Sequence, residues 1–340
     1  MLHRYRNNFD ILRLILSLTV VIVHLADLSQ IDELKSFSSY FSSVIAVDSF
    51  FIVSGFLIFM SFDKSSSLID YFLKRVRRIF PAYSSVIIIS SIFLYFVSTK
   101  SFNEYFSLEF IRYVIFNLFT LNFVQPTLSG VFENNHLQAV NGALWTIKIE
   151  IMFYILVPLI GYISVKRKKI FIYLIIYIVA ILYSLIMIWL FNNTNNEIFL
   201  KLEKQIPSQL AFFISGALIY HFYKEFKTKI ILIFTISIIV LYIHHNITNI
   251  YPLYPISLAV FIISFATQLK YLGNLSKFGD LSFGIYIWHF PIIQIFINYH
   301  LFNNLYFGLS IFILILLSIT LISWHFIEKP FLIDVNPMRN

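Results

Sequence analysis

Two ionisable residues lie in one line on the first apolar segment, residues 11–28. His24 follows Arg13 by eleven positions, so at about 100° per residue the two side chains return to within about 20° of each other, about 16 Å apart along a helix. Arginine stays charged and suits a phosphate, whereas histidine can take a proton from a hydroxyl. The pair fits a long donor with a phosphate head and a reactive tip. On these residues alone, a topology anchor (Arg13) and a core histidine (His24) remain the alternative.

Four further charged residues are candidates for the same site. Asp48 begins the second apolar segment, where an acid can orient a histidine or bind a sugar hydroxyl. Glu150 lies in the fourth apolar segment and needs a partner at that depth. Arg75 and Arg78 share a helical face. They can form a cytoplasmic phosphate clamp, or they can set topology and bind anionic lipid.

The composition indicates that membrane helices position these residues. The chain has 340 residues, of which 59% are hydrophobic and only 12% charged, against about a quarter charged in soluble domains. Its apolar stretches run to roughly 17–20 residues, enough to cross a hydrocarbon core of about 30 Å. We therefore predict an all-α integral membrane protein with about ten transmembrane helices, the third of them beginning near Pro81. The predicted spans are residues 11–28, 44–62, 81–99, 143–163, 171–191, 207–223, 229–246, 253–269, 283–301 and 305–325.

The distribution of basic residues sets the orientation. With both termini cytoplasmic, 19 of the 25 Lys and Arg fall on the cytoplasmic side, including the Lys166–Lys169 cluster and the residues Arg4, Arg6, Lys277 and Arg339. A further span at residues 110–128 would move that cluster outside. We therefore expect an external re-entrant or interfacial segment there, and residues 100–142 as a wall of an external substrate cleft. We predict that the whole chain, residues 1–340, forms a single transmembrane domain.

Several other kinds of chemistry are disfavoured. The net charge of +8 follows from the cytoplasmic loops, so no nucleic-acid partner is expected. The absence of cysteine excludes thiolate nucleophiles and Cys-ligated metals. His244 and His245 are adjacent and point to different helix faces, and we find no zinc-binding spacing, P-loop or nucleophile elbow. We expect no metal.

Six segments, in chain order, share their residues with one family. They are Asp10, Arg13 and His24; Phe50-Phe51 with Ser54-Gly55-Phe56; Arg75, Arg78-Ile79 and Pro81; Trp145-Thr146, Glu150, Phe153-Tyr154 and Pro158; Ser282, Tyr286, His289 and Pro291; and Glu328-Lys329-Pro330. Each segment alone is weak, but together they span nearly the whole chain. In this combination the chain resembles the acyltransferase 3 family of membrane-bound O-acyltransferases.

The resemblance implies a ten-helix core that takes an acyl group, usually acetyl, from cytoplasmic acyl-CoA and passes it to a carbohydrate hydroxyl on the extracytoplasmic side. The acceptor would be O-antigen, capsule, another exopolysaccharide or peptidoglycan. The family's first-helix arginine and histidine map onto Arg13 and His24, its cytoplasmic pair onto Arg75 and Arg78, and its glutamate onto Glu150. Arg13, Arg75 and Arg78 would then bind acetyl-CoA, and Arg13, His24, Asp48 and Glu150 would serve catalysis.

The sequence also departs from the family pattern. Lys148 stands where a small or polar residue is common, and Ile151 and Met152 replace a polar pair, which affects the detail of the acceptor cleft. Many members carry a fused SGNH-type hydrolase domain, whereas this chain ends shortly after Pro330. It is therefore expected to act alone or with separate polysaccharide-biosynthesis partners. The expected location is a bacterial cytoplasmic membrane, with lipid as the surrounding solvent.

The alternative from another class is a transporter or flippase for a polysaccharide precursor. Buried charges and a re-entrant segment also suit transport. We see neither an inverted repeat nor a pair of matching Gly- or Pro-broken helices, so the transferase is favoured. Consumption of acetyl-CoA distinguishes the two readings.

Overall fold

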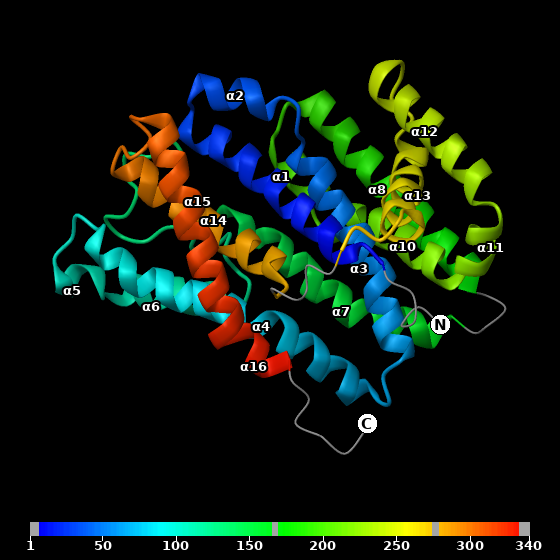
Figure 1. Ribbon diagram of the computed structural model, residues 1–340, viewed down its shortest axis with the longest axis horizontal. Coiled ribbons are helices and arrows are strands. Elements are labelled where there is room, and N and C mark those ends of the chain that lie inside the picture. Colours follow the sequence, from blue (N-terminus) through cyan, green and yellow to red (C-terminus); the bar gives the residue numbers. More distant parts are fainter. Residues whose placement is uncertain (1–6, 165–168, 274–278, 333–340) are drawn as a thin grey trace. The chain divides into compact units, whose positions relative to one another are not determined.

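The computed structural model describes residues 7–164, 169–273 and 279–332 (Figure 1). Helices form every regular element in these ranges, and no strand occurs there. The predicted all-α class is therefore confirmed. The orientation argument also used Arg4, Arg6, Lys166, Arg167, Lys168, Lys277 and Arg339, which lie outside the described residues.

Eight helices are long and apolar enough to cross a membrane. Some continue into a short 3₁₀ or π segment, and their α-helical parts are α1 (Phe9–Ser29), α3 (Ser43–Asp63), α4 (Leu68–Phe93), α7 (Trp145–Ile163), α8 (Lys169–Thr194), α13 (Tyr254–Gln268), α14 (Leu281–Asn298) and α15 (Leu305–Ile322). Two shorter helices, α10 (Ile206–His221) and α12 (Ile230–Asn246), fall on the remaining predicted spans. The chain thus has the helices of a multi-pass membrane protein. The total of about ten spans and the cytoplasmic placement of both termini stay predictions.

Shorter elements connect these helices. They are the α-helices α2 (Asp32–Ser38), α5 (Phe102–Tyr105), α6 (Leu108–Leu118), α9 (Ile198–Glu203), α11 (Tyr223–Thr228) and α16 (Lys329–Leu332), the 3₁₀ turns Leu94–Phe96, Gly142–Leu144 and Tyr251–Leu253, and a π-helix at Ser323–Glu328.

Helix α4 begins earlier than predicted. It starts at Leu68, so Pro81 lies inside the helix and does not open it. The residues before Pro81 are rich in Leu, Lys and Arg, which favour helix. Within a helix a proline removes one backbone hydrogen bond and bends the axis, and it need not end the helix where other contacts hold it. Arg75 and Arg78 therefore lie on a helix and one turn apart.

Residues 110–128 do not form a long helix. Helix α6 (Leu108–Leu118) has 11 residues, so it is about 16 Å long, well short of a hydrocarbon core of about 30 Å. Its end is held in place because Asn117 donates to the carbonyl of Gln125 (2.9 Å) and accepts from the Tyr83 hydroxyl through its own carbonyl. The segment is no candidate span, as predicted, and the choice between a re-entrant and an interfacial position stays a prediction.

The internal contacts divide the chain into two compact units. The first comprises residues 1–12, 44–71 and 149–273, and the second residues 13–43, 72–148 and 274–340. Helices α3, α8, α10, α12 and α13 belong to the first unit; α6, α14, α15 and most of α1 and α4 belong to the second. The single transmembrane domain stays a prediction.

Two glycines let α3 and α10 cross closely in the first unit. A Cβ on Gly55 would strike the main-chain carbonyl of Phe213, and one on Gly216 would strike the carbonyl of Ile52. Small residues are the usual means of close helix contact in membranes. The crossing positions the two ends of α3, which carry Asp48 and Asp63.

Gly55→Ala should therefore force the two helices apart. Backbone atoms cannot move aside, so we expect a loss of about 1–3 kcal/mol of stability, the usual cost of overpacking. The measurement is the apparent melting temperature in nanodiscs. Gly161→Ala is the control, because its added methyl meets only the ring of Phe62, which can rotate. An unchanged melting temperature for Gly55→Ala would contradict the close crossing.

Candidate active site

Two polar contacts join α1 to α14 in the second unit. Near the start of both helices Arg13 pairs with Asp280, and further along His24 Nδ1 lies 2.8 Å from His289 Nε2. The helices therefore run parallel, as the blue and orange ribbons of Figure 1 show. The sequence-predicted line from Arg13 to His24 thus has a partner residue at each end.

Hydrogen bonding fixes the tautomers of the two histidines. His289 Nδ1 lies 3.1 Å from the carbonyl of Ile285, which can only accept, so this nitrogen carries a hydrogen. His289 is fully buried, where a charged ring is costly, so its Nε2 is an acceptor. His24 Nδ1 therefore donates to His289, and His24 Nε2 keeps its lone pair. Among the described residues, His24 Nε2 has no hydrogen-bond partner.

Neighbouring side chains hold this pair in place. The ring of Phe290 meets His24 edge-on at 5.6 Å between centroids. Tyr286 lies three residues before His289 on α14. The hydroxyl of Tyr286 lies 2.7 Å from Thr146 Oγ1 on α7. This bond ties the start of α7 to α14 one turn before His289.

The loop at residues 129–142 is fastened to α14 near the histidine pair. Asn135 donates to Gln294 Oε1 (2.9 Å), and Asn141 donates to the carbonyl of Ile287 (2.8 Å). Gln294, fully buried, donates back to the carbonyl of Ala139 (2.8 Å). The loop thus covers α14 at the level of His289, and its role as a wall of an external substrate cleft stays a prediction.

An ionic cluster forms the other end of the site. Arg13 and Arg78 both bind the same oxygen of Asp280, and Ser282 donates to its other oxygen (2.7 Å). Burial by itself would raise the pKa of Asp280, but the charges of Arg13 and Arg78 and the hydrogen bonds from Ser282 and Arg78 hold the pKa well below its usual range. Asp280 is therefore ionised at every physiological pH. Arg75 lies half-buried one turn before Arg78 on α4.

The two candidate carboxylates belong to the first unit. Glu150 accepts a hydrogen bond from the Tyr154 hydroxyl (2.7 Å), which provides the partner its depth requires. Asp48 is 5% exposed on α3. Their catalytic roles stay predictions. We expected a carboxylate to orient the His24 ring. The residue in contact with His24 Nδ1 is His289 instead.

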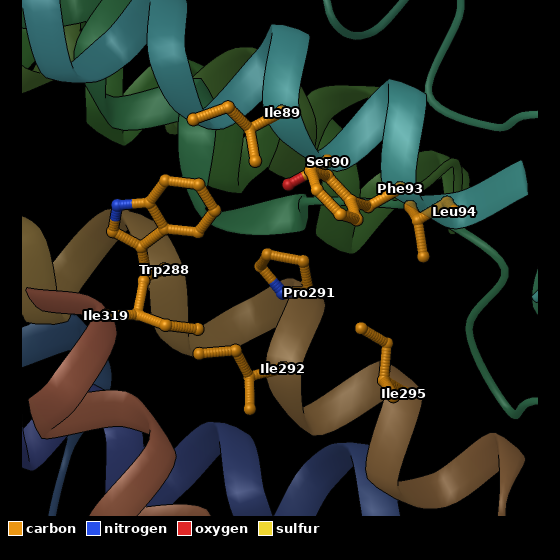
Figure 2. A pocket seen from close by; sticks show the side chains of 9 residues that line it. All are labelled: Ile89, Ser90, Phe93, Leu94, Trp288, Pro291, Ile292, Ile295 and Ile319. Carbon is orange, nitrogen blue, oxygen red and sulfur yellow. The ribbon is translucent and has the colours of Figure 1, made fainter. Parts of the chain in front are cut away.

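A pocket of about 280 Å³ lies between α4, α14 and α15. Figure 2 shows Phe93 and Ser90 of α4 facing Trp288 and Pro291 of α14. Ser90 carries the only hydroxyl group in the lining, and the other lining residues are aliphatic or aromatic. Such a lining suits hydrocarbon and offers little to a phosphate or a sugar, so this pocket is not the site for either polar substrate.

The sequence analysis did not single out Asp280, and it assigned no partner to His289. Asp280 precedes an apolar helix, where an acid commonly reads as a simple cap. Asp280 could have been recognised as an isolated acid at the cytoplasmic end of the predicted helices, the same end as Arg13 and Arg78. His289 was visible as a family residue, but only the parallel packing of α1 and α14 brings it to His24.

The chain has the helices of a multi-pass membrane protein, and α1 and α14 are joined by a histidine pair and, at their other ends, by an ionic cluster. The acyltransferase domain family matches residues 6–327. The chain therefore belongs to the acyltransferase 3 family and is an O-acyltransferase.

Two curated relatives are named as O-acetyltransferases. An O-acetyl transferase of Shigella phage Sf6 is 29% identical over 336 residues, covering 97% of each chain. Nodulation protein 10 of Rhizobium leguminosarum bv. viciae is 29% identical over 46% of this chain and 44% of its own. A Bacillus subtilis protein, YrhL, provisionally named as a peptidoglycan O-acetyltransferase, is 24% identical over 96% of this chain and 55% of its own. No solved structure matches the chain.

Proposed function

We propose that the protein transfers an acetyl group from cytoplasmic acetyl-CoA to a hydroxyl of an extracytoplasmic or lipid-linked polysaccharide, such as O-antigen, capsule or exopolysaccharide. The observation that carries the proposal is the unshared lone pair of His24 Nε2, directed by the His289 contact at the opposite ring nitrogen. The full-length similarity to an O-acetyl transferase supports acetyl as the group. The name of the Bacillus relative keeps peptidoglycan among the acceptors to be tested.

His24 Nε2 supplies the base that the reaction needs. The sugar oxygen attacks the thioester carbonyl carbon, the C–O bond forms, and the C–S bond breaks. The proton of the sugar hydroxyl passes to His24 Nε2 and ends on the sulfur of CoA. The same lone pair serves the alternative route, in which His24 carries the acyl group for a moment before the sugar takes it. In either route His289 accepts from His24 Nδ1 and keeps the ring oriented.

Arg13, Arg75 and Arg78 would bind the phosphates of acetyl-CoA. Asp280 contacts two of these guanidinium groups through one oxygen, which holds two positive charges side by side. About 16 Å of helix separates Arg13 from His24, a length that the pantetheine arm would cover. Asp48 and Glu150 would serve the acceptor.

The test is transfer of label. Protein in nanodiscs receives acetyl-CoA labelled in the acetyl group together with bacterial polysaccharide fractions, and alkali-labile label on the polysaccharide is measured. The proposal expects such label with release of one CoA per ester. If the protein instead moves an unmodified polysaccharide precursor across vesicles without consuming acetyl-CoA, it is a transporter and the proposal fails.

A further inference from the structure

Asp48 is a buried acid whose side chain has no evident structural role in the fold. It is 5% exposed, and among the described residues it forms neither a hydrogen bond nor an ion pair. A buried carboxyl group without a hydrogen-bond partner is costly inside a protein or a membrane, whether or not it carries a charge. A residue kept at that cost suggests a ligand that donates hydrogen bonds to it.

A second unsatisfied acceptor lies at the same level of the first unit. Helices α3 and α10 cross at Gly55 and Gly216 and run parallel, because the far ends meet where Tyr220 donates to Asp63 (3.1 Å). Asp48 on α3 and Gln209 on α10 therefore each lie a similar number of residues before the crossing. Gln209 is 5% exposed, and its Oε1 has no hydrogen-bond partner in the described part of the chain.

Hydroxyl and carboxylate groups complete this cluster. The charge of Glu203, on α9, acts on Asp48. Ser184 of α8 donates to Glu203 Oε1 (2.8 Å). The hydroxyl of Tyr251 has no hydrogen-bond partner in the described part of the chain. The Tyr251 side chain packs against three buried residues of α8 and α10, which are Ala180, Ile181 and Ala211. Five elements thus bring hydrogen-bonding groups together here.

Aromatic faces border the same groups. The ring of Tyr254 stacks on His244 at 4.5 Å between centroids, which covers one of its two faces, and it lies 6.4 Å from the ring of Tyr251. Flat rings beside carboxylate, amide and hydroxyl groups suit a sugar, whose C–H faces pack on aromatic rings while its hydroxyls donate to oxygens.

A bare cation is the competing ligand for two carboxylates. Calcium takes six to eight oxygen ligands, mainly carboxylates and carbonyls, and magnesium demands octahedral geometry. In the described residues no third acidic, histidine or cysteine side chain joins Asp48 and Glu203 in a metal-binding group. The neutral amide and hydroxyl groups instead favour a neutral ligand with many hydroxyls.

We propose that Asp48, Glu203, Gln209 and Tyr251 form a carbohydrate-binding subsite that holds the sugar acceptor. This inference rests on the proposed function, and it gives Asp48 a binding role in place of orienting His24. Asp48 and Gln209 accept from sugar hydroxyls, and Tyr251 and Tyr254 provide the aromatic border.

The experiment measures sugar binding without any acyl donor. Saturation-transfer NMR on protein in nanodiscs uses a panel of methyl glycosides of hexoses, 6-deoxyhexoses and N-acetylhexosamines. Asp48→Asn replaces one carboxyl oxygen by an NH2 group and Gln209→Leu removes the amide oxygen, so each variant should weaken binding about tenfold or more. Asp63→Asn, at the other end of α3, is the matched control and should bind normally.

The possible outcomes separate the readings. Weakened binding in both variants, at melting temperatures equal to that of Asp63→Asn, supports the subsite. Unchanged binding in Asp48→Asn, or no binding of any glycoside to the wild type, overturns it. If the wild type shows a heat of Na⁺ or Ca²⁺ binding and the Asp48→Asn variant shows none, the group is a cation site and the carbohydrate subsite is overturned. Because no donor is present, sugar binding can succeed while acetyl transfer fails, and the two proposals fail independently.

Discussion

His24→Ala protein should lose acetyl transfer by about 10²–10⁴-fold, the usual contribution of a positioned general base. The substitution removes Nε2, the nitrogen with the unshared lone pair, and it also leaves His289 Nε2 without its donor. Folding should be little affected, because His24 is only partly buried and makes no ion pair in the described part of the chain. The measurement is the initial rate of CoA release at saturating acetyl-CoA and acceptor.

The matched control is His325→Ala. His325 is an exposed histidine whose Nδ1 bonds the carbonyl of Leu321 in its own helix, and its loss should leave the rate within about twofold. A His24→Ala rate equal to that of wild type would remove His24 from the chemistry. The same loss in both variants would point to general damage instead.

Asp280→Asn should destabilise the second unit and weaken donor binding together. The carboxylate neutralises two guanidinium groups, and its side chain is 13% exposed. Removing one partner from a buried ionic group costs about 3–5 kcal/mol, and we expect about 3 kcal/mol because Arg13 and Arg78 keep 21% exposure. The KM for acetyl-CoA should rise, since Arg13 and Arg78 are no longer held side by side. Apparent melting temperature and donor KM are the two readouts.

The pH dependence of this effect follows from the sign of the shift. The pKa of Asp280 is lowered in the folded protein, because the charges of the two arginines outweigh its burial. Its stabilising contribution is therefore fully present above the unfolded pKa, near 3.9, and is lost only as the pH falls below that value. The stability difference between wild type and Asp280→Asn should stay constant from pH 5 to pH 8. A difference that vanished within this range would contradict the ionic cluster. Asp70→Asn is the control, because Asp70 is a half-buried acid in the first turn of α4 that accepts from the Ser66 N–H.

Hydrophobic length and charge predicted most of the fold. Each predicted span corresponds to a helix, because burial of apolar side chains over 17–20 residues leaves the chain little choice in lipid. The start of α4 was predicted too late in the chain. Pro81 favours a helix start at its own position, whereas the residues before it favour helix. Tertiary contacts decide between the two, and these cannot be derived from the local sequence. Residues 110–128 were correctly kept out of the spans by the charge pattern.

The site was predictable only along a single helix. The spacing of Arg13 and His24 follows from helix geometry, so one sequence suffices to align them. Their partners, Asp280 and His289, lie more than 260 residues away, and no local pattern states that α1 and α14 run side by side. The tautomer of His24, on which its chemistry depends, follows from the Ile285 carbonyl and could not have been derived before that packing was known.

The most direct test of the account is a double-mutant cycle on the two histidines. CoA release in the presence of acceptor is measured for wild type, His24→Ala, His289→Ala and the double variant. If His289 acts only by orienting His24, the single His289→Ala variant should lose less activity than His24→Ala, and the double variant should be no slower than His24→Ala alone. Losses that multiply in the double variant, or a His24→Ala protein that still releases CoA and acetylates its acceptor at the wild-type rate, would contradict acyl transfer at this histidine pair.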